Sequence, residues 1–83
     1  MQVTVKLFAT LSDYLPSGAR RNQLALEVPE HAVVADVIQD LHLPRKMVHL
    51  VLLNGIYLEP RQRESTPVTE GDAIAVWPPI AGG

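Results

Sequence analysis

The end of the chain carries residues that could do chemistry through the main chain itself. Residues 76–83 read VWPPIAGG, so two prolines follow an apolar stretch and two glycines finish the sequence. Pro78 and Pro79 have no backbone N–H and a fixed φ, so a sheet strand must stop there and the chain must leave it stiffly. A glycine-tipped segment can enter a channel too narrow for a Cβ and presents an unhindered carboxylate. The pattern indicates that the carboxylate of Gly83, next to Gly82, is the reactive group, and the alternative is an idle, frayed terminus.

The rest of the sequence lacks the usual catalytic and metal-binding constellations. The three histidines are scattered without helical pairing, and there is no cysteine. The five glycines form no phosphate-binding loop, and the serines lack a nucleophile-elbow context. The sequence therefore predicts no metal site, no cofactor bound by the chain and no catalysis by its own side chains. The lack of cysteine also fits a reducing compartment.

Charge is balanced along the sequence. The basic pairs Arg20-Arg21, Arg45-Lys46 and Arg61/Arg63 are offset by acidic residues, and the formal net charge is −2. Such a balance does not favour a nucleic-acid or membrane partner. Lys6 interrupts the apolar start, which excludes a secretion signal or a membrane span there. We interpret the charges as solvated surface and expect one soluble, cytoplasmic domain over residues 1–83.

The first half of the chain changes from strand period to helix period. Residues 2–9 and 22–29 alternate apolar and polar side chains, which predicts two antiparallel strands joined by a loop. Residues 34–41 place apolar side chains at helical spacing on one face. No Ser, Thr, Asp or Asn stands at the expected N-cap near Val33, so the helix is predicted to begin without a side-chain cap.

The second half contains the strongest local signal, a hairpin. In residues 48–60, VHLVLLNGIYLEP, the pair Asn54-Gly55 predicts a type I′ turn, because both central residues need positive φ. Residues 61–72 are polar and predict a loop with up to one helical turn, and residues 73–77 predict the last strand. The order β-β-α-β-β-β predicts an α+β fold in which one sheet packs on one helix.

Strand alternation places three of the four aromatic side chains away from the core. Phe8 and Trp77 lie opposite to their buried neighbours, and Tyr57 points away from the face expected for Ile56. Three aromatic rings on one outer sheet face would form an apolar patch on the scale of a partner-binding surface. The alternative is that the loop after the first strand folds over this face and packs Tyr14 there.

The order of elements resembles the β-grasp (ubiquitin-like) fold, a mixed sheet on one helix, and the chain is similar to the MoaD/ThiS sulfur carriers. The end EGDAIAVWPPIAGG has the family's Gly-Asp turn, apolar strand with outward aromatic residues, Pro-Pro and Gly-Gly. VKLFATL and VVADVIQDL resemble the family's first strand and helix. In its length and its Pro-Pro stop, the chain resembles the MoaD branch of the family, the small subunit of molybdopterin synthase, more than the ThiS branch. Val33 departs from the family, which often has Thr or Ser there.

The resemblance implies a non-catalytic carrier. An adenylating enzyme of the MoeB/ThiF kind, using ATP and magnesium, would activate Gly83, which then becomes a thiocarboxylate. The thiocarboxylate would donate sulfur in molybdopterin (molybdenum or tungsten cofactor) biosynthesis, inside a MoaE-like large subunit. The first and last strands would be parallel neighbours, and Gly82 would give clearance. The residues expected to contact partners are Phe8, Tyr57, Trp77, Pro78, Pro79, Ile80 and Ala81.

Three alternatives stay open on the sequence. The chain could be a ubiquitin-like protein modifier, a ThiS-type carrier for thiamin biosynthesis, or a β-grasp binding adaptor with an idle tail. The sequence does not distinguish the cofactor pathway, the activating enzyme, the sulfur donor or the oligomeric state.

Overall fold

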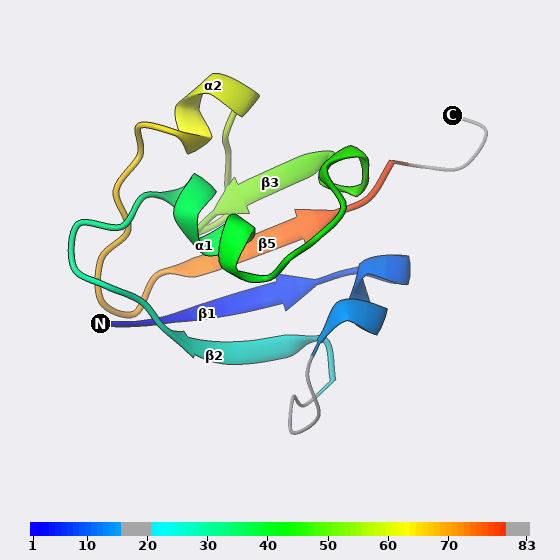
Figure 1. Cartoon of the computed structure of the whole chain (residues 1–83), viewed down its shortest axis with the longest axis horizontal. Helices are drawn as coiled ribbons and strands as arrows, with labels where there is room; N and C mark the ends of the chain where they lie inside the picture. Colours follow the sequence, from blue (N-terminus) through cyan, green and yellow to red (C-terminus); the bar gives the residue numbers. More distant parts are fainter. Residues whose placement is uncertain (16–20, 80–83) are drawn as a thin grey trace.

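A computed structural model describes residues 1–15 and 21–79, and its helical segments pack on one side of a five-stranded sheet (Figure 1). Its elements are β1 (Gln2–Leu7), the 3₁₀ helix η1 (Ala9–Tyr14), β2 (Gln23–Glu27), α1 (Val34–Asp40), the 3₁₀ helix η2 (Arg45–Met47), β3 (Leu50–Leu53), β4 (Ile56–Tyr57), α2 (Pro60–Arg63) and β5 (Ala73–Trp77). The predicted order of strands and main helix is confirmed. The single-turn α2 lies where the sequence allowed one helical turn.

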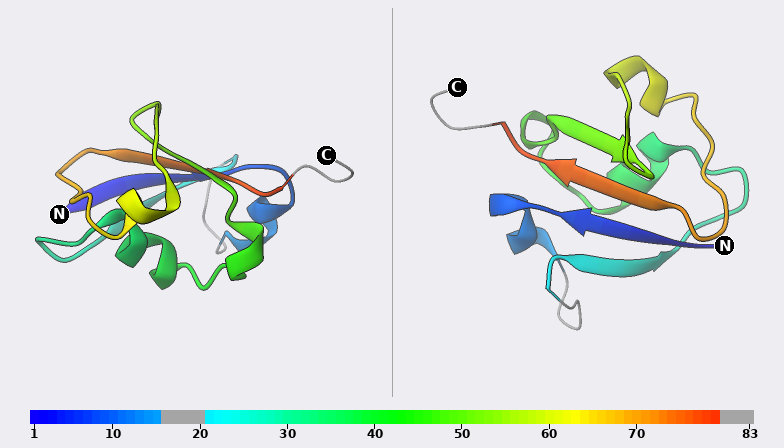
Figure 2. Two further views of the ribbon diagram at one scale, coloured as in Figure 1. Left: turned by 90° about the horizontal axis from the view of Figure 1, so that it is seen from above. Right: turned by 180° about the vertical axis from the view of Figure 1, so that it is seen from behind.

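The sheet is mixed, with strand order β2-β1-β5-β3-β4. The central pair, β1 and β5, is parallel, with Leu7 opposite Val76, while the remaining pairs are antiparallel. The parallel pairing of the first and last strands confirms the expectation from the resemblance. Figure 2 shows the sheet edge-on, with the helices gathered beneath it.

The core fills the space between the sheet and α1. Every second residue of the two central strands points inward and is buried, as the alternation predicts. From α1, Val34 and Val37 are fully buried against this inner face. The buried residues of the core are Val3, Val5, Leu7, Leu11, Val28, Ala32, Val34, Val37, Val51, Leu58, Val68, Ile74 and Val76.

One expected core residue lies outside. Ile56 is 69% exposed, whereas Leu58 is buried as predicted. Because β4 contains two residues and forms the edge of the sheet, Ile56 next to the turn has no element packed on it in the described part of the chain.

The start of α1 is held by groups other than a capping side chain at Val33. The backbone N–H of Val33 donates to Asp36 Oδ2 at 3.0 Å, which is half of a capping box. The N–H of Val34 donates to the carbonyl of Thr66 at 3.0 Å. The predicted lack of an N-cap side chain is confirmed, and a carbonyl from a distant loop accepts from one of the N–H groups that have no partner within the helix.

The hairpin turn is tied to the start of β5. Asn54 and Gly55 both have positive φ, 51° and 83°, as a type I′ turn requires. The Asn54 side chain donates to Asp72 Oδ1 at 3.0 Å and accepts from the N–H of Ala73 at 2.9 Å. The hydrogen bond from Asn54, assisted by the backbone of Thr69, holds the pKa of Asp72 below its ordinary value of 3.8 against the opposing effect of burial.

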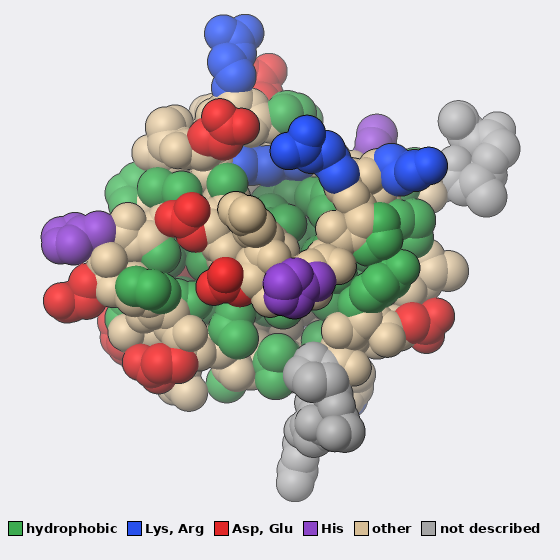
Figure 3. All heavy atoms as spheres, in the orientation of Figure 1, with side chains coloured by type: hydrophobic (Ala, Val, Ile, Leu, Met, Phe, Trp, Pro, Cys, Tyr) green, Lys and Arg blue, Asp and Glu red, His purple; other side chains and the backbone are tan. Residues whose placement is uncertain are grey.

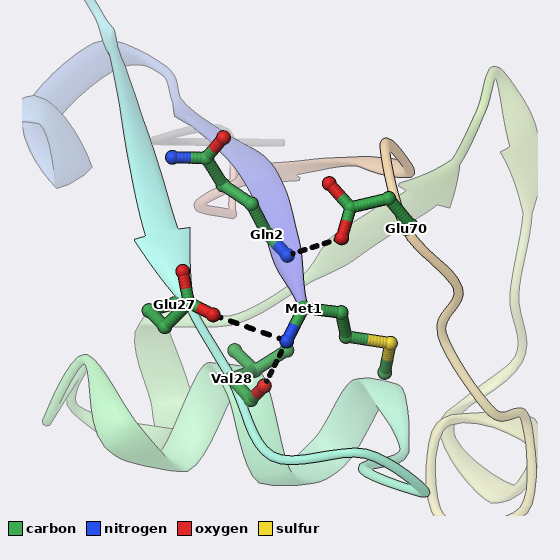
Figure 4. A network of polar contacts seen from close by, with 5 residues as sticks. All are labelled: Met1, Gln2, Glu27, Val28 and Glu70. Carbon is green, nitrogen blue, oxygen red and sulfur yellow. Dashed lines mark hydrogen bonds and ion pairs between the residues drawn. The ribbon is translucent and has the colours of Figure 1, made fainter.

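The start of β1 is fastened to two neighbouring segments (Figure 4). The amino group of Met1 donates to the carbonyl of Val28 at 2.9 Å and pairs with Glu27 Oε2 at 3.1 Å. The N–H of Gln2 donates to Glu70 Oε1 at 2.9 Å. These contacts join the start of β1 to the end of β2 and to the turn before β5.

Candidate functional site

The site is built on the outer face of the sheet, opposite the core. Phe8 directly follows β1 and Trp77 ends β5, and the parallel register places their side chains next to each other. Their rings stack with centroids 4.1 Å apart and planes at 2°. The N–H of Phe8 donates to the carbonyl of Val76 at 3.1 Å, which extends the strand pairing to the stack itself. Both side chains remain partly exposed.

The third aromatic side chain, Tyr57, lies on the same face, two strands away from the stack. It is 50% exposed on β4, opposite Leu52 of β3. Leu50 and Leu52 lie between it and the stack, because Leu50 pairs with Trp77 and Leu52 with Ala75. We call this surface the outer patch, formed by Phe8, Leu50, Leu52, Tyr57, Ala75 and Trp77.

The residues of β3 in the outer patch were missed by the reasoning from sequence. LVLL, residues 50–53, is continuously apolar, and the hairpin signal took precedence over that observation. An uninterrupted apolar run in a strand indicates that both of its faces meet apolar surroundings. This signal could have identified Leu50 and Leu52 as members of an apolar outer face.

The described part of the first loop does not cover the outer patch. η1 turns toward the core and buries Leu11, while Tyr14 stays 43% exposed. The alternative in which Tyr14 packs over the outer face is therefore wrong for residues 9–15. Residues 16–20 lie outside the described part of the chain.

The two prolines end the sheet beside this patch. β5 ends at Trp77, as predicted, and the carbonyl of Trp77 accepts a hydrogen bond from the N–H of His49 at 3.0 Å. Pro78 is half-buried and Pro79 is exposed. Beyond them, Ile80, Ala81, Gly82 and Gly83 lie outside the described residues. The structure thus places the outer patch next to Pro78 and Pro79, from which the tail continues.

The chemical character of this site is apolar. In the part of the chain that the structure describes, no group of three or more His, Asp or Glu side chains could hold a metal ion. No helix among those residues is long and apolar enough to span a bilayer. Partly exposed aromatic side chains on an apolar surface are typical of a surface that binds another protein.

The comparisons with known proteins agree with this architecture. Residues 1–81 match the model of a family described as Mut7-C ubiquitin. No protein with a curated description matches the chain in sequence.

Solved structures share the fold over the whole chain. The HVO 2177 protein of Haloferax volcanii is 27% identical with a TM-score of 0.79, covering 100% of this chain and 87% of that one. SAMP1, also from Haloferax volcanii, is 23% identical with a TM-score of 0.72, and both chains are covered completely. A chain in the complex of subunits 1 and 2 of the molybdopterin-converting factor from Helicobacter pylori is 20% identical with a TM-score of 0.61, again with complete coverage of both. Together with the family match, these likenesses confirm the predicted β-grasp, ubiquitin-like fold.

Proposed function

The chain belongs to the Mut7-C ubiquitin family, and we propose that it is a sulfur carrier whose C-terminal Gly83 is adenylated and converted to a thiocarboxylate. The observation that supports this most is the position of Trp77. It ends the last strand, stacks on Phe8 in the outer patch and directly precedes Pro78-Pro79. A partner that binds the outer patch is thereby placed next to the residues that lead to Gly83.

The proposed chemistry takes place on the terminal carboxylate, with the catalytic groups supplied by a partner. A carboxylate is a poor electrophile, so an adenylating enzyme of the MoeB/ThiF kind uses ATP and magnesium to form the Gly83 acyl-adenylate and pyrophosphate. A sulfur donor at the oxidation level of sulfide then attacks the carbonyl carbon and displaces AMP, leaving Gly83 as a thiocarboxylate. The chain itself is not an enzyme in this scheme.

Each predicted site residue has a role in the proposal. Phe8, Tyr57 and Trp77 bind the partner's apolar surface, and Pro78 and Pro79 direct the tail away from the sheet. The roles of the last four residues follow from their types, and these residues lie outside the described part of the chain. Ile80 and Ala81 contact the partner's groove, Gly82 leaves room for the catalytic groups, and Gly83 carries the sulfur.

Molybdopterin biosynthesis is the pathway we propose for the sulfur. The likeness to a chain of the Helicobacter pylori molybdopterin-converting factor complex supports it, as does the Pro-Pro stop before the tail. In this pathway a MoaE-like large subunit accepts the tail and uses the thiocarboxylate as sulfur source. A ThiS-type role in thiamin biosynthesis would use the same activated Gly83.

Protein modification is the second candidate, because the fold is also that of SAMP1, the small archaeal modifier protein 1. The amine of a lysine on a target protein would then attack the carbonyl of the same Gly83 adenylate, forming an isopeptide bond and releasing AMP. Isopeptide-linked products in cells would support this function, whereas a mass gain of one sulfur-for-oxygen replacement supports the carrier.

Intact-protein mass spectrometry tests the proposal. The wild-type chain is incubated with the adenylating enzyme, ATP and a sulfur donor, beside a variant with one alanine appended after Gly83. We expect the sulfur-for-oxygen mass gain in the wild-type chain alone, with equal melting temperatures for both. Continued sulfur transfer by the appended variant would contradict the carrier. If deleting Gly82 and Gly83 left every partner interaction and the cellular phenotype unchanged, the chain would be an adaptor with an idle tail.

A further inference from the structure

The strand directions bring residues from distant parts of the sequence to one end of the sheet. β1 and β5 are parallel, and β2 and β3 run antiparallel to them. The last residues of β1 and β5 therefore lie at the same end of the sheet as the first residues of β2 and β3. We call this the tail end, because β5 ends there at Trp77.

Cationic side chains gather at the tail end. Lys6 lies near the end of β1 and Arg21 just before β2, while Arg45 and Lys46 form most of η2, which leads into β3. Arg63 reaches this region from α2, because its Nη2 donates to the carbonyl of His49 at 3.0 Å. Figure 3 shows Lys and Arg side chains gathered between α2 and the side on which β5 ends. We call these five residues the basic end.

Acidic side chains gather at the opposite end. Glu27 pairs with Gln2 at the start of β1, and Glu70 and Asp72 precede β5. Glu30 follows β2 and is exposed there. Asp13 in η1 is an acidic residue on the basic side. The other described acidic residues, Asp36, Asp40, Glu59 and Glu64, lie in α1 or next to α2, so the charge separation concerns the two ends of the strands and not the whole molecule.

No cation of the basic end forms an ion pair with an acidic side chain among the described residues, although Arg63 donates to a backbone carbonyl. The salt bridge found among the described residues joins the amino group of Met1 to Glu27, at the acidic end. No described carboxylate lies within ion-pair distance of the basic end, and Arg45, Lys46 and Arg21 are exposed. A cluster of like charges without counter-charges adds repulsion to the folded state, so the fold gains nothing from it.

We propose that the basic end binds an acidic protein surface that surrounds the site where the partner receives the tail. This inference rests on the proposed function, since it names the chemistry of the partner that activates Gly83. A protein partner fits better than a nucleic acid, because the basic end borders the apolar outer patch and the chain carries a net charge of −2. Repulsion between an acidic partner and the acidic end orients the chain so that the tail end approaches first.

Charge reversal with a matched control tests this inference. Lys46→Glu removes a cation of the basic end, and Arg61→Glu makes the same change of charge on α2, which lies away from the end of β5 in Figures 1 and 2. Activation of Gly83 by the adenylating enzyme is measured as ATP–pyrophosphate exchange at varied carrier concentration. We expect Lys46→Glu to lower kcat/KM about fivefold at low salt, and Arg61→Glu to have little effect. The difference should disappear at ~0.5 M salt, where screening shortens the range of the interaction to a few ångströms.

Each other outcome overturns the inference. Equal losses of kcat/KM for both variants would show a general effect of net charge. A loss of kcat/KM in Lys46→Glu that persists in high salt would indicate a local contact that does not depend on an acidic partner surface. Tight binding of a fluorescent poly-uridine RNA that Lys46→Glu abolishes would assign the basic end to nucleic acid. No exchange activity with the wild-type chain would contradict the proposed function, and the inference with it. Matching circular dichroism melts would establish that both variants fold.

Discussion

The two faces of the sheet differ in chemistry although they belong to the same strands. The inner face is aliphatic and sealed: Val5, Leu7, Ile74 and Val76 have no exposed surface. The outer face is apolar from β5 to β4 but mostly polar along β1 and β2, and it carries the stacked rings of Phe8 and Trp77, which stay partly exposed.

This difference separates what the fold needs from what it leaves available. Burial beneath α1 accounts for the aliphatic residues of the inner face, since removing them from water stabilises the folded state. No described element covers the rings of the outer face, so folding does not explain their presence. We therefore assign the inner face to stability and propose that the outer face binds a partner.

The largest expected effect contrasts two adjacent residues on opposite faces. Leu7→Ala should lower the free energy of unfolding by about 3 kcal/mol, because it opens a cavity in the sealed core. Phe8→Ala, the matched variant on the outer face, should cost about 1 kcal/mol, mainly through loss of the ring stack. Urea denaturation of both variants measures the difference. Equal losses would mean that the outer face also supports the fold.

The next effect concerns binding. Trp77→Ala should weaken the affinity for the adenylating partner by about 2 kcal/mol, the scale of an interface hot spot. Tyr14→Ala is the control, since Tyr14 is also partly exposed but lies outside the outer patch. Calorimetric titration gives both affinities. An unchanged affinity for Trp77→Ala would remove this residue from the interface.

A smaller effect concerns the tie between the hairpin and β5. Asp72→Ala should cost about 1 kcal/mol at neutral pH, because hydrogen bonds from Asn54 and Thr69 are lost. The folded state lowers the pKa of Asp72, so its contribution is complete above the unfolded pKa and disappears as pH falls through the lower folded pKa. Denaturation from neutral pH down to about pH 2.5 should thus show a shallower acid decline in the variant. Parallel declines would contradict the role of this carboxylate.

The smallest effect lies at the acidic end. Glu27→Gln removes the ion pair with the Met1 amino group, but the Glu27 side chain is 78% exposed. Solvent screens such a pair, so the loss of stability should not exceed about 0.5 kcal/mol. Thermal melts at low and moderate salt measure it. A larger, salt-sensitive loss would show that this contact, rather than the core, fixes the start of β1.

The sequence was sufficient to predict which way most strand residues point, but not which of them meet. Alternation alone placed Phe8 and Trp77 on the outer side of their strands. Their stacking depends on the parallel register that sets Leu7 opposite Val76, and this register joins segments at opposite ends of the chain. The sequence-based expectation of this contact came from the resemblance, which supplied the topology.

Long-range contacts account for the remaining differences. The Thr66 carbonyl that accepts from the first turn of α1 comes from a distant loop, so no local pattern near Val33 predicts it. Ile56 has the right type and alternation for a core position, but the edge of the sheet leaves it exposed. The basic end is invisible along the sequence, because Lys6, Lys46 and Arg63 are far apart in the chain and only the fold places them toward the same end of the sheet.

The parallel pairing of β1 and β5 determines how the domain resists a mechanical pull. The tail continues from β5, so a force applied beyond Pro79 acts along that strand. The backbone hydrogen bonds between β1 and β5 lie across the direction of pull. They run from the bond between Thr4 and Asp72 to the bond between Phe8 and Val76, and they share the load in shear. Extracting β5 requires these bonds, and those with β3 on its other side, to break together. A protein that pulled on the tail would therefore load the hydrogen bonds on both sides of β5 at once.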